Sequence, residues 1–219
     1  MKDIKERTKS WWKLNLANFI TVVGLFLTIV FIYLCLYHPE MLWLIAALII
    51  PIEASDYIDG KIARRYGESL LGSILDRKRD RVFIFPSLII LAWHHRWKLE
   101  QLPTALVYAG KILIIITIIL EVITLLTFFV GVVLKSIEIV FYNQKKEKLD
   151  LGPNEAGRDS IYCGFAVITV WIWSLTIEKY SGLPVIYFST PLLAYGLGRM
   201  IWKRILSLHG YWERVFPKN

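Results

Sequence analysis

Apolar residues fill most of the chain in six long stretches, which short polar segments separate. The first stretch, Ala17 to Tyr37, contains 21 residues and no charged side chain. At about 1.5 Å per residue, this length suffices to cross a hydrocarbon core of roughly 30 Å. The pattern therefore predicts an all-α integral membrane protein with six transmembrane helices. The other five stretches begin near Met41, Leu70, Thr104, Ile161 and Leu183.

The segments around these stretches predict how the helices are joined. The fourth stretch runs from Thr104 to about Phe141, which exceeds one perpendicular crossing, so we expect its C-terminal end to project as a cytosolic extension. Trp and Lys residues in the opening segment, 1–16, are typical of an amphipathic helix at the membrane interface. A cleaved signal peptide is disfavoured, because the apolar stretch is too long and no small-x-small site follows. The predicted connections are His38-Pro39-Glu40, His94 to Pro103 and Glu178 to Gly182.

Composition and charge support the membrane interpretation. A hydrophobic content of 56% argues against disorder and against a water-soluble globule, and two cysteines in apolar runs cannot form a disulfide scaffold. The net charge of +8 suits nucleic acid or anionic lipid. With a cytoplasmic N-terminus, only Arg96, Lys98, Lys111 and Lys179 of the 26 Lys and Arg lie on or near the far side. The positive-inside rule thus explains the charge without nucleic acid.

The same reasoning predicts the organisation of the chain. We expect both termini and the active site to be cytosolic. Since no presequence is seen, we expect the protein to lie in a prokaryotic plasma membrane. The whole chain, 1–219, is expected to form a single membrane domain. Its parts are a juxtamembrane segment, 1–16, a six-helix bundle, 17–208, and a cytosolic tail, 209–219.

Four aspartates lie at the ends of the second and third stretches, where acidic side chains are costly in a membrane and indicate a functional site. Asp56 and Asp59 are spaced i, i+3, and Asp76 and Asp80 are spaced i, i+4, so each pair projects from one helical face. A short turn through Tyr66 to Ser69 allows the two helices to run antiparallel. The four carboxylates are therefore expected to converge.

Convergent carboxylates repel one another unless cations neutralise them. An all-oxygen site suits Mg²⁺ or Mn²⁺ better than zinc, and the four histidines lie apart from the acids. Small residues accompany the acids: Gly60, Ala63 and Gly72. Because Gly costs about 1 kcal/mol inside a helix, we interpret these residues as clearance for a ligand, with close helix packing as the alternative.

These residues carry a resemblance to a known family. The pattern Asp-x-x-Asp-Gly-x-x-Ala-Arg, seven residues, then Gly-x-x-x-Asp-x-x-x-Asp, resembles the signature of the CDP-alcohol phosphotransferases, membrane enzymes of phospholipid synthesis. That family has six spanning helices behind an amphipathic segment. Asn18-Phe19-Ile20-Thr21 is similar to its Asn-x-x-Thr on the first helix, and Gly157-Arg158-Asp159-Ser160 is loosely similar to its turn before the fifth helix.

The resemblance implies transfer of a phosphatidyl group from a donor of the CDP-diacylglycerol type to the hydroxyl of a second alcohol, with release of CMP. Asp56, Asp59 and Asp76 would hold two Mg²⁺ or Mn²⁺ ions. Asp80 would act as general base and also contact the second ion. A homodimer is implied as well. The residues that would bind the donor are Asn18, Thr21, Asp56, Gly60, Ala63, Arg64 and Gly72.

Some positions depart from the family pattern. Ala17 replaces the Pro that usually precedes the Asn of the first helix, and Gly24 stands where glycerophosphate-accepting members usually have Arg. Those members also carry Asp-Pro-x-Ala-Asp-Lys, where this chain has Asp76-Arg77-Lys78-Arg79-Asp80-Arg81. These departures are more similar to members that use inositol phosphate or other polar acceptors. The basic run 77–79 is either an anchor at the membrane face or part of an anion-binding surface.

Arg158 and Arg199 are the candidates for acceptor binding, because both are expected near the cytosolic ends of their helices. A bound phosphate would offset two basic groups at that depth, while anchoring at lipid phosphates is the alternative. The acceptor is thus predicted to be a phosphorylated alcohol, inositol phosphate or glycerol 3-phosphate, with serine or another amino alcohol and a second lipid left open.

The sequence is less consistent with two other functions. A divalent-cation channel or transporter would need acids across the bilayer, but the four aspartates lie near one face and only Glu121 is mid-helix. A pseudoenzyme that keeps only the fold is disfavoured by the intact motif.

Overall fold

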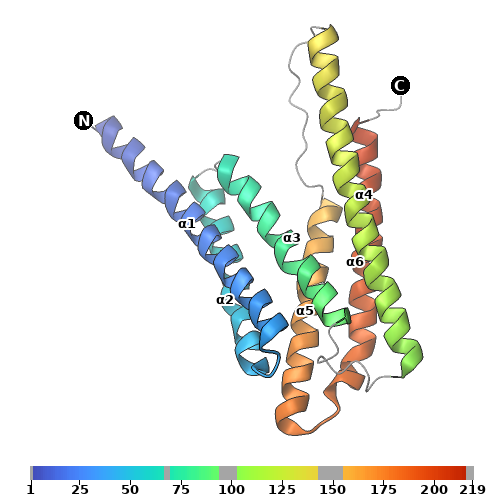
Figure 1. Ribbon diagram of the computed structural model, residues 1–219. Coiled ribbons are helices and arrows are strands. Elements are labelled where there is room, and N and C mark those ends of the chain that lie inside the picture. Colours follow the sequence, from blue (N-terminus) through green and yellow to red (C-terminus); the bar gives the residue numbers. More distant parts are fainter. Residues whose placement is uncertain (1, 67–69, 94–102, 143–154, 216–219) are drawn as a thin grey trace. The chain divides into compact units, whose positions relative to one another are not determined.

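The computed structural model describes residues 2–66, 70–93, 103–142 and 155–215, nearly all of which lie in α-helices, without a strand among them (Figure 1). The all-α prediction is confirmed. The helices are α1 (Lys2–Tyr37), α2 (Leu42–Tyr66), α3 (Leu70–Trp93), α4 (Thr104–Tyr142), α5 (Glu155–Ser181) and α6 (Val185–Val215).

Three described segments are long and apolar enough to cross a membrane: Leu16–Tyr37, Thr104–Thr127 and Glu155–Ser181. The second of these occupies only the first part of α4, whose remaining residues continue the helix to Tyr142. α2, α3 and α6 carry more charged side chains and each contains a proline. Six crossings therefore stay a prediction, whereas the positions of the six helices agree closely with the apolar stretches.

Two helix boundaries add to the sequence predictions or correct them. Residues 1–16 were expected to form an amphipathic interfacial helix before the first crossing, and α1 runs without a break from Lys2 to Tyr37. α5 continues to Ser181, so the connection to α6 does not begin at Glu178 as predicted. The chain leaves α5 at Gly182, whose φ of 72° lies in the left-handed region that glycine adopts without strain. The predicted connection His94 to Pro103 lies outside the described residues except for Pro103.

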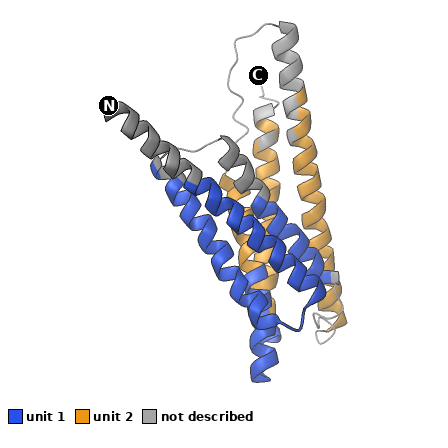
Figure 2. Ribbon diagram, turned by 60° about the vertical axis from the view of Figure 1, so that its left-hand side comes forward, with its two compact units in different colours: residues 1–99, 168–189 blue, residues 100–167, 190–219 orange. Residues whose placement is uncertain are grey.

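The chain divides into two compact units (Figure 2). Unit 1 contains residues 1–99 and 168–189, and unit 2 contains 100–167 and 190–219. In unit 1, α1 packs against both α2 and α3. The Phe31 and Phe83 rings of α1 and α3 lie 5.1 Å apart between centroids and are fully buried. This packing brings Thr21 of α1 next to Asp59 of α2.

Unit 2 contains α4, the first part of α5 and most of α6. Ser160 on α5 donates a hydrogen bond to the backbone oxygen of Met200 on α6, at 3.1 Å. Glu121 of α4 and Arg204 of α6 form a buried ion pair, with 3.0 Å between Oε2 and Nη2. Arg204, one of the cations predicted on the cytoplasmic side, is thus buried beside Glu121. A single acid within an apolar helix indicates that a cationic side chain pairs with it, but the sequence pattern does not identify that side chain.

Candidate active site

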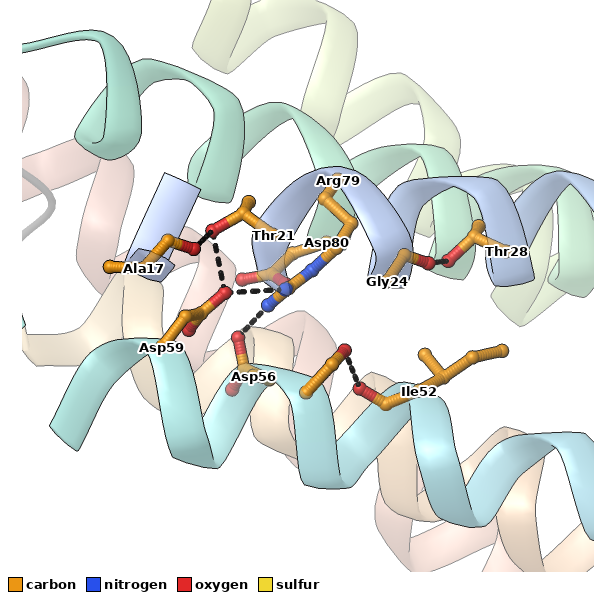
Figure 3. Close-up of polar contacts among 10 residues, drawn as sticks. Ala17, Thr21, Gly24, Thr28, Ile52, Asp56, Asp59, Arg79 and Asp80 are labelled. Atoms are coloured by element: carbon orange, nitrogen blue, oxygen red, sulfur yellow. Dashed lines mark hydrogen bonds and ion pairs between the residues drawn. The ribbon is translucent and has the colours of Figure 1, made fainter. Parts of the chain in front are cut away.

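The candidate site lies in unit 1, where α2 and α3 carry the aspartates of the motif (Figure 3). Asp56 and Asp59 are one turn apart on α2, and both project toward α3 and the Arg79 side chain. Asp80 follows Arg79 on α3, with its Oδ1 3.6 Å from Arg79 Nη2. The structure thus brings three of the four predicted aspartates around one guanidinium.

Arg79 is the centre of this cluster. Its side chain is only 1% exposed, and Nη1 donates to Asp59 Oδ2 at 2.9 Å. Its Nη2 donates to Asp56 Oδ1. A buried guanidinium is costly unless carboxylates compensate it, and the forked geometry of Arg suits two acceptors at once. This role was not predicted from the sequence, where Arg79 belongs to a basic run interpreted as a membrane anchor or as part of an anion-binding surface.

Thr21 of α1 completes the hydrogen bonding of Asp59. Its hydroxyl lies 2.7 Å from Asp59 Oδ2 and 3.1 Å from the backbone oxygen of Ala17, and the side chain is buried. A hydroxyl has one proton, so these two acceptors share it. Asp59 Oδ2 therefore accepts from both α1 and α3, which holds its carboxylate in one orientation.

Replacing Thr21 by Val is expected to lower the free energy of unfolding by about 1.5 to 3 kcal/mol, because the buried Asp59 carboxylate loses a hydrogen-bond donor. Denaturant unfolding of the detergent-solubilised protein measures this loss. Thr28→Val is the matched control, since the Thr28 hydroxyl is also buried on α1 but donates only to the backbone oxygen of Gly24, at 2.9 Å. Equal losses in the two variants would contradict a specific role for Thr21.

Gly24 leaves room for the guanidinium between α1 and the other two helices. A Cβ atom at Gly24 would lie 3.2 Å from Arg79 Nη1 and would overlap Ser55 Oγ on α2. Ser55 is itself fixed by donating to the backbone oxygen of Ile52, at 2.7 Å. A larger residue at this position therefore requires Ser55 or Arg79 to move.

The remaining predicted site residues are placed as follows. Asn18 is partly exposed on α1, and Gly60 is partly exposed on α2 directly after Asp59. The side chains of Ala63, Arg64, Gly72 and Asp76 lie outside the described residues, although their backbone belongs to α2 or α3. Their assigned roles stay predictions.

The two candidate acceptor residues belong to unit 2. Arg158 on α5 and Arg199 on α6 are both exposed, and Arg199 Nη1 donates to the hydroxyl of Tyr195 at 3.2 Å. Lys203, one turn after Arg199, forms an ion pair of 2.6 Å with Asp159, which neighbours Arg158. The start of α5 and the middle of α6 therefore present several cations together, with Asp159 as their acidic neighbour, and Arg199 does not lie at the end of its helix as expected.

The chemistry of the carboxylate cluster suits a divalent cation, because Asp56, Asp59 and Asp80 offer only oxygen ligands and carry more negative charge than Arg79 neutralises. In the arrangement described, however, Arg79 holds the oxygens of Asp56 and Asp59. Among the described residues, no three His, Cys, Asp or Glu side chains are grouped so as to hold a metal ion. A cation bound here would thus require a rearrangement around Arg79.

The fold and the site together define a class: a helical protein with membrane-spanning segments and a cluster of aspartates, carried by two neighbouring helices, around a buried arginine. A model of the CDP-alcohol phosphatidyltransferase family matches residues 14–186. The chain belongs to the CDP-alcohol phosphatidyltransferase family, and it is an integral membrane protein. The resemblance inferred from the aspartate motif is confirmed.

One curated relative is similar to part of the chain. The cardiolipin synthase (CMP-forming) of Streptomyces coelicolor is 39% identical over 70 residues, which cover 25% of this chain and 33% of the relative. The match thus spans about a third of the relative's length. It supports the family without identifying the acceptor.

Proposed function

We propose that this protein transfers the phosphatidyl group of a CDP-linked lipid, of the CDP-diacylglycerol type, to the hydroxyl of a polar, phosphorylated alcohol. The observation that carries the proposal is the cluster of Asp56, Asp59 and Asp80 in a member of this family. Carboxylates that α2 and α3 hold together are unfavourable for folding alone, and through bound divalent cations they would suit a reaction that builds negative charge on a pyrophosphate.

The reaction replaces one phosphoester bond with another. The acceptor oxygen attacks the phosphorus next to the lipid, and the bond from that phosphorus to the bridging oxygen of CMP breaks. Asp80 takes the proton from the attacking hydroxyl. Asp56, Asp59 and Asp76, with Asp80, would hold two Mg²⁺ or Mn²⁺ ions, which supply positive charge to the pyrophosphate and the leaving CMP. The donor would lie against Gly60, Ala63 and Gly72, with Asn18, Thr21 and Arg64 at its polar end.

The exposed cations of unit 2 favour an acceptor that carries phosphate. Arg158 and Arg199 present guanidinium groups, which bind phosphate oxygens through charge-assisted hydrogen bonds. Inositol phosphate and glycerol 3-phosphate both fit this chemistry. A cytosolic position of the site, which the charge distribution favours, would give it access to such soluble acceptors.

Arg158→Gln and Arg199→Gln are each expected to raise the acceptor KM by about tenfold to a hundredfold, the effect of losing one charge-assisted hydrogen bond of about 1.5 to 3 kcal/mol. The donor KM should change little. Steady-state kinetics with one substrate saturating measures both values. Lys179→Gln removes an exposed cation at the other end of α5 and serves as the control. Unchanged acceptor kinetics in both Arg variants would leave these residues as lipid anchors.

A second lipid is the other candidate acceptor, since the relative from Streptomyces coelicolor is named a cardiolipin synthase that forms CMP. A channel or transporter is less favoured, because the mid-helix acid Glu121 is ion-paired with Arg204.

The test is CMP release from CDP-diacylglycerol in detergent, with and without Mn²⁺ or Mg²⁺. Acceptors are supplied separately: inositol phosphate, glycerol 3-phosphate, serine, and phosphatidylglycerol as a phospholipid with a free hydroxyl. Release with a phosphorylated soluble acceptor supports the first proposal, and release only with phosphatidylglycerol supports the second. No cation-dependent CMP with any acceptor would refute the enzymatic function.

A further inference from the structure

Arg79 is a cation that the chain itself supplies to its carboxylate cluster. The guanidinium is 1% exposed and lies within reach of Asp56, Asp59 and Asp80 (Figure 3). An arginine at the membrane face would extend into water or toward lipid phosphates. Its burial among acids shows that it neutralises the cluster from within.

The contacts of Arg79 use the oxygens that a divalent cation would need. Asp59 Oδ2 accepts from Arg79 Nη1 at 2.9 Å and lies 2.7 Å from the Thr21 hydroxyl, so both of its lone pairs are directed at donors. Asp56 Oδ1 accepts from Nη2 of the same guanidinium. A cation bound to these two oxygens would meet the positive charge of Arg79 at contact distance. Guanidinium and divalent cation therefore exclude each other at this place.

The neighbouring helix accommodates the guanidinium in this position. Gly24 of α1 faces it, and a Cβ atom there would lie 3.2 Å from Arg79 Nη1. The arrangement therefore depends on α1 as well as on the two helices that carry the acids.

We propose that Arg79 is an internal counter-cation that competes with the divalent cation for Asp56 and Asp59, and thereby sets the cation affinity of the site. The inference rests on the proposed cation-dependent function. Without a divalent cation, Arg79 stabilises the buried carboxylates. When the cation binds, the guanidinium leaves these oxygens, so the free energy of its ion pairs is subtracted from the free energy of cation binding.

The experiment measures Mn²⁺ binding to the detergent-solubilised full chain by electron paramagnetic resonance of free Mn²⁺. Arg79→Gln is expected to raise the Mn²⁺ affinity by about tenfold to a hundredfold, the equivalent of one lost charge-assisted hydrogen bond. Arg79→Lys keeps the charge but not the fork and is expected to lie between the wild type and Arg79→Gln. If Arg79→Gln does not fold, the comparison of Arg79→Lys with the wild type tests the inference. Lys61→Gln is the charge-matched control, because Lys61 is exposed on α2 with its Nζ near the Tyr57 ring.

Thermal unfolding gives a second readout that does not depend on activity. With EDTA, Arg79→Gln should melt below the wild type, and saturating Mn²⁺ should raise its Tm by more than it raises that of the wild type. A purely structural role would lower the Tm by the same amount in both conditions. Equal Mn²⁺ affinity in the wild type and both Arg79 variants overturns the inference and leaves the cation site intact. Absence of Mn²⁺ binding in every protein overturns the inference together with the proposed cation site.

Discussion

Asp59→Asn is expected to reduce CMP release by at least about a thousandfold while the protein stays folded, and Asp56→Asn is expected to do the same. Each substitution is nearly isosteric but removes a negative charge from the proposed cation site, whose ions supply several kcal/mol of transition-state stabilisation. Asp59 has the stronger structural constraint, because its Oδ2 accepts from Thr21 and Arg79 together. Initial rates with a CDP-linked donor and Mn²⁺ measure the effect.

The matched control for these variants is Glu53→Gln. Glu53 lies one turn before Asp56 on the same helix, and its Oε1 accepts a hydrogen bond from Thr169 at 3.0 Å, which the amide oxygen of Gln also accepts. Its rate should stay near that of the wild type. Gel filtration and helical circular dichroism establish that each variant is folded. Turnover of Asp56→Asn or Asp59→Asn at a rate close to that of Glu53→Gln would refute the assignment of these aspartates.

The helices were predictable because the length and apolar character of the runs indicate helices that cross a membrane. The expected end of the fourth stretch, about Phe141, agrees with the end of α4 at Tyr142. The continuous α1 was not predictable from the same signal, because hydropathy changes near residue 16 while the backbone geometry does not. Hydropathy indicates which part of a helix contacts lipid, but it does not predict whether the helix continues beyond that part.

The site was predictable only as far as helical spacing reaches. Spacings of three and four residues place side chains on one face, which is how Asp56, Asp59 and Asp80 were selected. The position of Arg79 depends on its side-chain rotamers and on space beside another helix, which no local spacing encodes. Two of the positions that depart from the family pattern, Gly24 and Arg79, meet in the structure, since a Cβ at Gly24 would lie 3.2 Å from Nη1 of that guanidinium. Read separately in the sequence, they gave no sign of this contact.

Asp80→Asn is expected to lower kcat by about a hundredfold to ten-thousandfold, the range of a lost general base, while donor binding is retained. Asp80 differs from the two α2 aspartates in its surroundings. Its side chain is 14% exposed, and its Oδ1 lies 3.6 Å from Arg79 Nη2, a longer separation than the 2.9 Å between Asp59 Oδ2 and Nη1. The longer separation means that the guanidinium competes less with an acceptor hydroxyl for Asp80 Oδ1 than for Asp59 Oδ2.

The donor KM, the Mn²⁺ affinity and the pH–rate profile together distinguish a base from a metal ligand. If Asp80 acts chiefly as the base, Asp80→Asn changes the donor KM and the Mn²⁺ affinity much less than Asp56→Asn does, and its pH–rate profile loses the rise that belongs to deprotonation of the base. Asp56→Asn supplies the comparison, because a lost ligand weakens Mn²⁺ binding directly. A loss of donor and Mn²⁺ affinity in Asp80→Asn as large as in Asp56→Asn would make Asp80 chiefly a ligand. Another group would then have to take the proton from the acceptor hydroxyl.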